Sequence, residues 1–214
     1  MKEANYMSSK EYFDKVANDW DTMRKEFFPD SVRDTAYNAA AIQPGHIAAD
    51  IGAGTGFLTE GLLRRGIKVI AVDQSQAMLD YMKNKFGADG NVEYHIGVSS
   101  ALPVPDNTAD AVFANMYLHH VESPPDAIKE MTRILKPGGV LVITDLDKHD
   151  YEFLVTEQHD RWMGFERADV SAWFQDAGLE EVHIDCVGDN CCAASKTGED
   201  KAMVSIFIAS GRRR

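Results

Sequence analysis

The stretch from Asp50 to Gly56, Asp-Ile-Gly-Ala-Gly-Thr-Gly, constrains this chain more than any other, because three glycines separate a predicted strand from a predicted helix. Residues 46–51 form a short apolar run typical of a buried strand, and residues 57–65 carry apolar side chains at helical spacing. Glycine permits a sharp turn and lets bare backbone approach a ligand. Free N–H groups of the following helix then face the crevice above the strand ends, where α/β sheets bind ligands. The sequence therefore predicts a ligand-binding loop in an α/β fold.

A carboxylate about 20 residues beyond the glycines indicates the class of ligand. Residues 68–72 form a β-branched run that ends in Asp73, whose carboxylate is placed to accept hydrogen bonds from ribose hydroxyls. The loop reads G-x-G-x-G, and Phe57 stands where a dinucleotide loop has its third glycine. No Lys-Ser or Lys-Thr pair closes the segment as in a phosphate loop. Asp50 would repel a pyrophosphate and suits an ammonium group, so these features together favour a nucleoside-containing cofactor that carries an amino group.

These features, with further motifs in the expected order, resemble class I S-adenosylmethionine-dependent methyltransferases of the type 11, ubiquinone-biosynthesis-like subgroup. The family's first motif is D-x-G-x-G-x-G, and residues 71–75 with Met78 resemble its second motif. Residues 117–121, Tyr-Leu-His-His-Val, resemble the segment after its fourth strand. Residues 133–139, Arg-Ile-Leu-Lys-Pro-Gly-Gly, match its turn into the fifth strand, and residues 12–21 resemble its N-terminal helix.

The resemblance implies S-adenosyl-L-methionine as the cofactor and a set of residues that bind it. Asn115 would face the methionyl part of the cofactor, or else cap the turn that follows it. Some members place an acid near the adenine after the third strand, but Val98 stands at that position here, so Ser99, Ser100 or backbone groups are expected to replace it. The predicted cofactor residues are Trp20, Asp50, Gly52, Ala53, Gly54, Gly56, Asp73 (ribose), Gln74, Met78 (adenine), Ser99, Ser100 and Asn115.

The family also implies the fold, a Rossmann-like α/β arrangement with a seven-stranded, mostly parallel sheet, a reversed last strand, helices on both faces and an N-terminal helical cap. The predicted strands are 47–51, 68–73, 92–96, 110–115, 140–145, 179–187 and 202–210, and the predicted helices are 57–65, 75–86, 125–135 and 168–177, with two more within 8–41. The length suits one domain over 1–214, divided into a cap (1–45), a cofactor-binding core (46–145), a lid insert (146–166) and a closing helix and hairpin (167–214).

The charge of the chain limits its partners. There are 34 acidic and 22 basic residues, and the net charge of −12 opposes binding to nucleic acid and to anionic lipid surfaces. No apolar run approaches the 18 or so residues of a membrane span, and the first four residues do not resemble a signal peptide. We expect a cytoplasmic enzyme with a small-molecule acceptor, no nucleic-acid partner and no membrane partner. The apolar closing hairpin leaves pairing into a homodimer open.

Three histidines are candidates for catalysis, although methyl transfer from a sulfonium needs mainly alignment and only sometimes a base. His149 and His159 each precede an aspartate, and both His-Asp pairs are expected over the cleft, beyond the fifth strand and a short helix. Histidine titrates near neutral pH, so either pair suits a general base. A solvated polar loop is the alternative for both. His119 is the third candidate, and its alternative role is packing a helix under the sheet edge.

The cysteines suggest a second function. Cys186, Cys191 and Cys192 lie within seven residues of one another, and thiolates favour soft centres such as trivalent arsenic, so thiol-assisted methylation of arsenite is one alternative. The other reading is that they are small residues in the closing hairpin. No C-x-x-C zinc pattern is present, and no metal ligand is predicted. An alternative of another class is a non-catalytic S-adenosylmethionine-binding sensor or scaffold.

Overall fold

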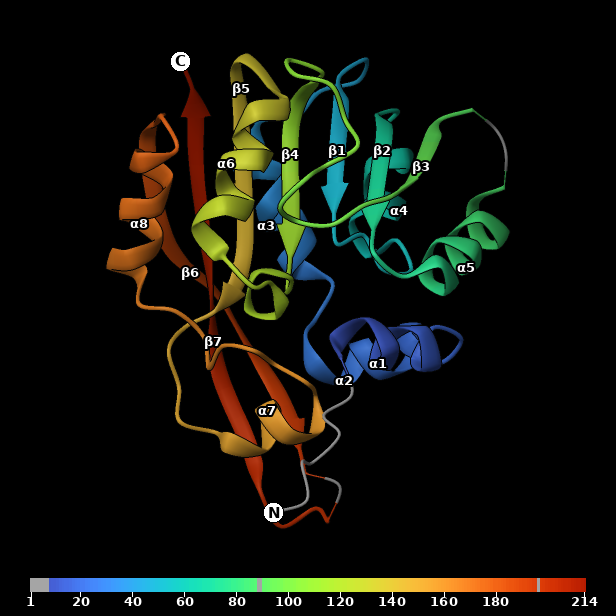
Figure 1. Cartoon of the computed structure of the whole chain (residues 1–214), viewed down its shortest axis with the longest axis vertical. Helices are drawn as coiled ribbons and strands as arrows, with labels where there is room; N and C mark the ends of the chain where they lie inside the picture. Colours follow the sequence, from blue (N-terminus) through green and yellow to red (C-terminus); the bar gives the residue numbers. More distant parts are fainter. Residues whose placement is uncertain (1–7, 88–89, 196) are drawn as a thin grey trace.

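The computed structural model describes residues 8–87, 90–195 and 197–214, so the first seven residues of the predicted cap lie outside the described ranges. These ranges contain a seven-stranded sheet in the order β3-β2-β1-β4-β5-β7-β6 (Figure 1). β7 runs antiparallel to β5 and β6, while the other neighbouring pairs are parallel. The predicted Rossmann-like sheet with a reversed last strand is confirmed. The strands are β1 (Ile47–Ile51), β2 (Lys68–Asp73), β3 (Val92–Ile96), β4 (Ala109–Asn115), β5 (Leu135–Leu146), β6 (Leu179–Ala194) and β7 (Lys201–Arg213).

Helices cover both faces of the sheet, as predicted. They are α1 (Ser9–Val16), α2 (Trp20–Phe27), α3 (Ser31–Ala40), α4 (Phe57–Arg64), α5 (Gln76–Phe86), α6 (Pro124–Ile134), α7 (Glu152–Glu157) and α8 (Arg167–Asp176), with a 3-10 turn, η1 (Leu118–His120). Figure 1 shows α6 and α8 in front of the sheet and α3 and α4 behind it. One apolar cluster includes Ile128 and Phe174, and the other includes Val32 and Leu62. The central strands are apolar along most of their length because both of their faces are buried.

The cap differs from its prediction, because residues 8–41 form three helices rather than two. α1 begins with a capping box in which Ser8 and Glu11 bond each other's backbone N–H groups. The helix ends at Val16 without a glycine or proline, and α2 starts again at Trp20. Figure 1 shows α1 and α2 beyond the carboxyl ends of β1 and β2. α1 contacts α5 through Asp14 and Ser75, whereas α2 contacts the glycine loop through Asp21 and Thr55, so the two helices dock separately and local sequence gives no signal for the break.

The closing hairpin is longer than predicted. β6 continues to Ala194 and β7 spans Lys201–Arg213, whereas the predicted strands were 179–187 and 202–210. β6 is an edge strand with alternating burial near its end: Cys191 and Ala193 are buried, and Cys192 between them is exposed. Because polar residues occupy the exposed face, the sequence of this part of β6 does not show the apolar run that predicts a strand. In Figure 1 this hairpin extends past the carboxyl edge of the parallel strands, beside α7.

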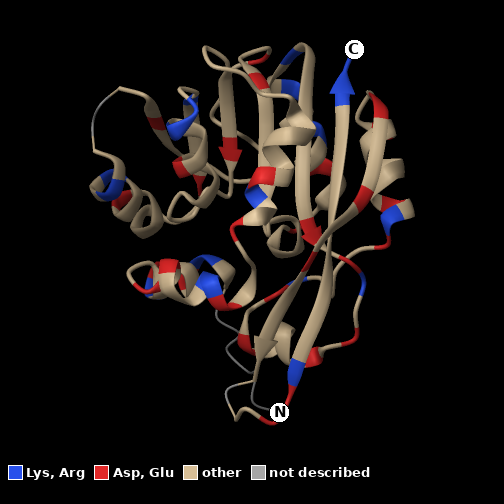
Figure 2. Cartoon of the chain, turned by 180° about the vertical axis from the view of Figure 1, so that it is seen from behind, with Lys and Arg blue, Asp and Glu red and all other residues tan. Residues whose placement is uncertain are grey.

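Charged residues of both signs are interspersed over the fold. Figure 2 shows Asp and Glu beside Lys and Arg on the cap helices, and places the basic C-terminal end of β7 at the top of the view, away from α1 and α2. Arg212 and Arg214 pair there with Glu181 and Glu180. None of the described helices combines the length and the apolar character that crossing a bilayer requires.

The loop between β1 and α4 has no room for side chains at its first glycine. Gly52 has a φ of +69°, and an added Cβ would lie 2.1 Å from Cδ2 of Tyr117. The N–H groups of Gly52 and Ala53 both donate to the carbonyl of Val72 at the end of β2. The aromatic ring therefore sits directly on the loop backbone, which explains why this position requires glycine.

We expect Gly52→Ala to lower the free energy of unfolding by more than the roughly 1–3 kcal/mol of a left-handed alanine alone. The added strain comes from the contact with the Tyr117 ring. Gly45→Ala is the matched control, because Gly45 has a φ of +90° and an added Cβ would meet no atom within 4 Å. Urea unfolding of both variants measures the difference, and equal losses would show that the ring moves away at no cost.

Candidate functional site

A cavity with about 680 Å³ of empty space lies between the glycine loop and the cap, and we call it the loop cavity. It lies at the carboxyl ends of β1, β2 and β4, where α/β sheets bind ligands. Nine of the twelve predicted cofactor residues line it: Trp20, Asp50, Gly52, Ala53, Gly54, Asp73, Gln74, Met78 and Asn115.

Asp73 fixes the loop as well as lining the cavity. Its carboxylate accepts hydrogen bonds from the backbone N–H groups of Gly54 and Ser75, both at 2.8 Å. Each oxygen keeps a further lone pair for a ligand hydroxyl. Burial raises the pKa of Asp73, although these backbone N–H groups act in the opposite direction. The ribose contact predicted for Asp73 therefore fits the bonds that this carboxylate already makes.

Asp50 is a buried acid at the same end of the sheet, with an exposed fraction of 2%. One of its oxygens accepts hydrogen bonds from the backbone N–H of Thr59 at 3.1 Å and from its hydroxyl at 2.7 Å. Burial raises the pKa of Asp50 to about 6, even though both Thr59 bonds favour the ionised form. A cationic group in the loop cavity would offset this cost of burial.

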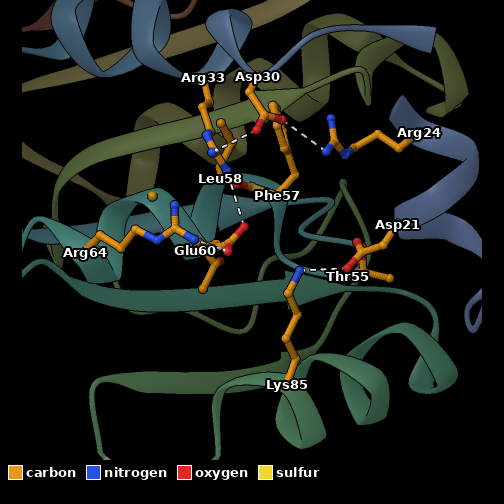
Figure 3. A network of polar contacts seen from close by, with 12 residues as sticks. Asp21, Arg24, Asp30, Arg33, Thr55, Phe57, Leu58, Glu60, Arg64 and Lys85 are labelled. Atoms are coloured by element: carbon orange, nitrogen blue, oxygen red, sulfur yellow. Dashed lines mark hydrogen bonds and ion pairs between the residues drawn. The ribbon is translucent and has the colours of Figure 1, made fainter. Parts of the chain in front are cut away.

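Polar contacts hold the cap against the loop (Figure 3). The carboxylate of Asp21 on α2 accepts a hydrogen bond from Thr55 in the loop at 2.5 Å and pairs with Lys85 on α5 at 2.8 Å. Ser75, the N-cap residue of α5, donates to Asp14 on α1 at 2.6 Å. Trp20 is the neighbour nearest to Gly54: its indole nitrogen lies 3.8 Å from the position of an added Cβ. The cap thus forms one wall of the loop cavity.

Arg24 is a site residue that the sequence analysis missed. Its side chain is 93% buried, and its guanidinium lies 4.2 Å from the centre of the Phe57 ring. It pairs with Asp30 at 3.1 Å, and Figure 3 shows Asp30 between Arg24 and Arg33. Among the residues that line the loop cavity, Arg24 is the sole Lys or Arg. A charged residue on a short helix gave no sequence signal, because its role depends on where the cap docks.

The three remaining predicted cofactor residues lie elsewhere. Ser99 and Ser100 line a neighbouring cavity, which we call the third cavity, together with Val98. Its lining shares Ser9, Gln74, Tyr117 and His120 with that of the loop cavity. Gly56 lines none of the cavities described here, and an added Cβ there would lie 2.4 Å from the Phe86 ring. Gly56 therefore allows close packing of α4 against α5.

A further cavity, with about 470 Å³ of empty space, adjoins the loop cavity, and we call it the hairpin cavity. Its lining is mostly aromatic and aliphatic, with polar groups at one end. It shares five residues with the loop cavity: Phe13, Trp20, Phe28, Met116 and His120. The rest of its lining is Tyr12, Phe27, His119, Leu146, Leu154, Gln158, Asp160, Cys191 and Ala193.

His119 lies at the polar end of the hairpin cavity within a buried cluster. Its Nδ1 is 2.7 Å from Asp145, and its Nε2 is 3.7 Å from Asp160. Burial alone would lower the pKa of His119, but the two carboxylates outweigh it and raise the pKa to about 9. Burial raises the pKa of Asp160 to about 6. Burial also lowers the pKa of His120 well below its usual value, and the charge of the neighbouring His119 lowers it further. His119 thus pairs with acids distant in sequence.

The other two predicted catalytic histidines lie outside the linings of the three cavities described. His149 is buried, and its Nδ1 accepts a hydrogen bond from the Tyr151 backbone at 3.2 Å. Burial, followed by the charge of His119, lowers its pKa. His159 has a φ of +61° and packs with its ring centre 4.9 Å from that of Tyr12. Of the three histidines, His119 therefore lines one of the cavities described, and His149 and His159 line none of these.

The cysteines do not converge. Cys191 is buried in the hairpin cavity wall, whereas Cys186 and Cys192 are exposed. Successive side chains of a strand point to opposite faces, so Cys191 and Cys192 face away from each other. In the described ranges, the one group of three or more metal-ligating side chains within 4.8 Å is His119, His120 and Asp160, which contains no thiol. Nothing in this arrangement supports a three-thiol arsenite site.

Comparisons with known proteins agree with the predicted family. Residues 49–143 match the methyltransferase domain family. The ubiquinone/menaquinone biosynthesis C-methyltransferase UbiE of Hydrogenovibrio crunogenus is 34% identical over 149 residues, which cover 65% of this chain and 58% of that protein. The chain thus spans roughly half the length of the curated relatives it matches.

Solved structures share the fold over nearly the whole chain. A putative methyltransferase in complex with the Trm112 methyltransferase activator of Haloferax volcanii is 20% identical, with a TM-score of 0.77 over 96% of this chain and 97% of that one. Phosphoethanolamine N-methyltransferase 2 of Haemonchus contortus, in complex with S-adenosyl-L-methionine, is 14% identical, with a TM-score of 0.78 over 98% of this chain and 60% of that one.

We expect a water-soluble disulfide reagent to modify Cys186 and Cys192 rapidly in the native protein and Cys191 only after unfolding. Burial protects Cys191 and raises the pKa of its thiol to about 12, so little thiolate forms near neutral pH. Thiol counting before and after denaturant measures this. Cys191→Ser should leave the rapid count at two, and a fall in that count would contradict the assignment.

Proposed function

We propose that this chain, a class I S-adenosylmethionine-dependent methyltransferase of the type 11 subgroup by its residues 49–143, transfers a methyl group from that cofactor to a small molecule in the hairpin cavity. The cofactor supplies an activated methyl group, and the protein supplies alignment. The observation that carries the proposal is that the two cavities adjoin and share the lining residues Phe13, Trp20, Phe28, Met116 and His120. A cofactor in one cavity and an acceptor in the other would meet where the cavities adjoin, which the in-line approach to the methyl carbon requires.

The polar groups of the loop cavity match the cofactor's two ends. S-adenosylmethionine carries an ammonium and a carboxylate on its methionyl part, and a diol on its ribose. Asp50 suits the ammonium, Arg24 suits the carboxylate, and Asp73 suits the diol. Ser99, Ser100 and Gln74 line the third cavity, on the side where an adenine would lie beyond the ribose. An anion, a cation and a diol acceptor in one cleft favour a zwitterionic nucleoside.

The hairpin cavity favours a compact acceptor with an apolar body. Phe27, Leu146 and Leu154 offer apolar surface, whereas His119 and Asp160 offer polar contacts at one end. Apart from Met116, His119 and His120, its lining comes from outside residues 49–143. The proposed acceptor side of this chain thus lies largely outside the residues that match the methyltransferase domain family, so the name of the Hydrogenovibrio relative does not identify the acceptor.

His119 lines the hairpin cavity, which supports contact with an acceptor. His149 and His159 do not line this cavity, so it gives no support for a catalytic role of either. A non-catalytic sensor would need only the loop cavity, so the adjoining cavity favours catalysis. The cytoplasmic location, the homodimer and the division of the chain into cap, core, lid and hairpin stay predictions.

Two ligands separate the proposed contacts. We expect Asp73→Ala to weaken both S-adenosylhomocysteine and 5′-methylthioadenosine, because both carry the ribose diol. Arg24→Met should weaken S-adenosylhomocysteine by about 10–100-fold, the value of one charge-assisted bond, and leave 5′-methylthioadenosine unchanged because it lacks the amino-acid part. Calorimetric titration measures both.

Arg33→Met is the matched control for Arg24→Met. Arg33 also stacks on Phe57, with its guanidinium 5.3 Å from the ring centre, but it does not line the loop cavity. Equal losses for the two arginine variants, or for the two ligands with Arg24→Met, would contradict the carboxylate contact.

The pKa of Asp50 predicts a pH dependence of binding. Below about pH 6 the carboxyl is protonated, and a cationic ligand must displace that proton, so affinity for S-adenosylhomocysteine should rise with pH up to about 6 and then level off. Asp50→Asn should reduce the rise, and 5′-methylthioadenosine, which has no ammonium, should show less of it. Titrations at pH 5, 6, 7 and 8 measure the profile, and an unchanged rise in Asp50→Asn would refute the contact.

A further inference from the structure

We propose that His119, His120 and Asp160 bind one divalent transition-metal ion, with Zn²⁺ as the best match, at the polar end of the hairpin cavity. The inference concerns metal binding alone and stands whether or not the chain transfers methyl groups. Two imidazoles and a carboxylate form a nitrogen and oxygen ligand set that Zn²⁺ accepts. The three side chains offer ligand atoms that all lie within 4.8 Å of one another.

The spacing of these atoms fits ligands around an ion better than hydrogen-bonded partners. Nε2 of His119 lies 3.7 Å from Oδ1 of Asp160, and Nδ1 of His120 lies 3.9 Å from the same oxygen. Hydrogen bonds of this kind measure about 2.7–3.2 Å. Ligands about 2.0–2.1 Å from a tetrahedral Zn²⁺ are roughly 3.3 Å apart. Each of the two separations between a histidine nitrogen and Asp160 would therefore shorten by about half an ångström around an ion.

His119 is held as a metal-binding histidine usually is. Its Nδ1 bonds the carboxylate of Asp145 at 2.7 Å, which leaves Nε2 as the nitrogen that faces Asp160. Asp145 is itself fixed, because it accepts hydrogen bonds from the backbone N–H groups of Tyr117, Leu118 and Leu146. A carboxylate behind a ligating imidazole sets its orientation and raises its basicity.

His120 supplies an independent observation. Its side chain is nine-tenths buried, and its Nδ1 has no hydrogen-bond partner among the described residues. A buried polar atom without a partner costs about 1–3 kcal/mol, and a metal ion would satisfy it. This Nδ1 and the Nε2 of His119 both lie near Oδ1 of Asp160, so the atom without a hydrogen-bond partner belongs to the cluster.

Asp160 is placed over the two histidines by backbone contacts. The N–H groups of Arg161 and Trp162 both donate to the carbonyl of His119, at 2.9 and 3.1 Å. The carboxylate is 6% exposed, and a buried acid needs a compensating positive charge. Three protein ligands would leave a fourth position on the ion open, as catalytic zinc sites do, and here it would face the hairpin cavity.

Metal titration of the full chain tests the inference. Because exposed thiols also bind these metals, the parent protein carries Cys186→Ser and Cys192→Ser. We expect it to bind one Zn²⁺ per chain by calorimetry, and one Co²⁺ with the visible absorption of a four- or five-coordinate ion. His120→Asn and Asp160→Asn should each weaken binding by at least about 100-fold, and Asp145→Asn by about 10–100-fold through His119.

His183→Asn is the control, because it removes an exposed imidazole on β6 and should leave the affinity within about twofold. Circular dichroism melting verifies that each variant folds, and Zn²⁺ should raise the melting temperature of the parent and not that of Asp160→Asn. The competing description is an ion pair between a protonated His119 and Asp160 without metal. Absent binding in the parent, or binding that His120→Asn and Asp160→Asn both leave intact in folded protein, would overturn the inference.

Discussion

The hydrogen bond from the Gly54 amide to the Asp73 carboxylate links the two strands on which the site depends. It joins the loop after β1 to the end of β2, and the Val72 carbonyl reinforces the link by accepting from Gly52 and Ala53. With the loop fixed there, Thr55 lies where Asp21 reaches it, and the cap docks through that contact. Both walls of the loop cavity therefore depend on the position of a few backbone N–H groups.

Much of the fold could be predicted because its signals are local. The strands β1, β2, β4 and β5 carry apolar runs, and the glycine loop marks the end of β1 in the sequence itself. The Lys136–Gly139 segment, predicted as a turn before the fifth strand, instead lies inside β5, where the pairing with β4 shifts register. The break between α1 and α2 could not be predicted from the sequence, because it depends on how α2 docks against the glycine loop. The end of β6 was missed because only one face of an edge strand is buried.

The candidate site also contains residues with a local sequence signal and residues without one. The loop residues and Asp73 carry a recognisable spacing, and the structure places them together in the loop cavity. His119 pairs with Asp145, 26 residues away, and with Asp160, and a cluster whose members are so far apart in the chain carries no local signal. Arg24 was missed because burial of an arginine against Phe57 is a property of the assembled cap.

Asp50 makes the free protein less stable than it would be with a neutral residue of the same shape. The folded state raises the pKa of Asp50 above that of an exposed aspartate, so its contribution to the free energy of unfolding falls as pH rises between about 4 and 6. At neutral pH the ionised group is buried beside an open cleft. A cation that binds there relieves this cost, which couples ligand binding to the stability of the fold.

The origin of the cavity walls bears on how such a chain can change over evolutionary time. The loop cavity is built largely from residues 49–143, whereas most of the hairpin cavity comes from the cap, the segment around α7 and the extended β6. The cap lines both cavities, whereas the segment around α7 and the end of β6 line the hairpin cavity alone, so substitutions or length changes in these two segments alter that cavity and leave the glycine loop intact. Such changes would reshape the pocket for the proposed acceptor without altering the backbone that holds the proposed cofactor.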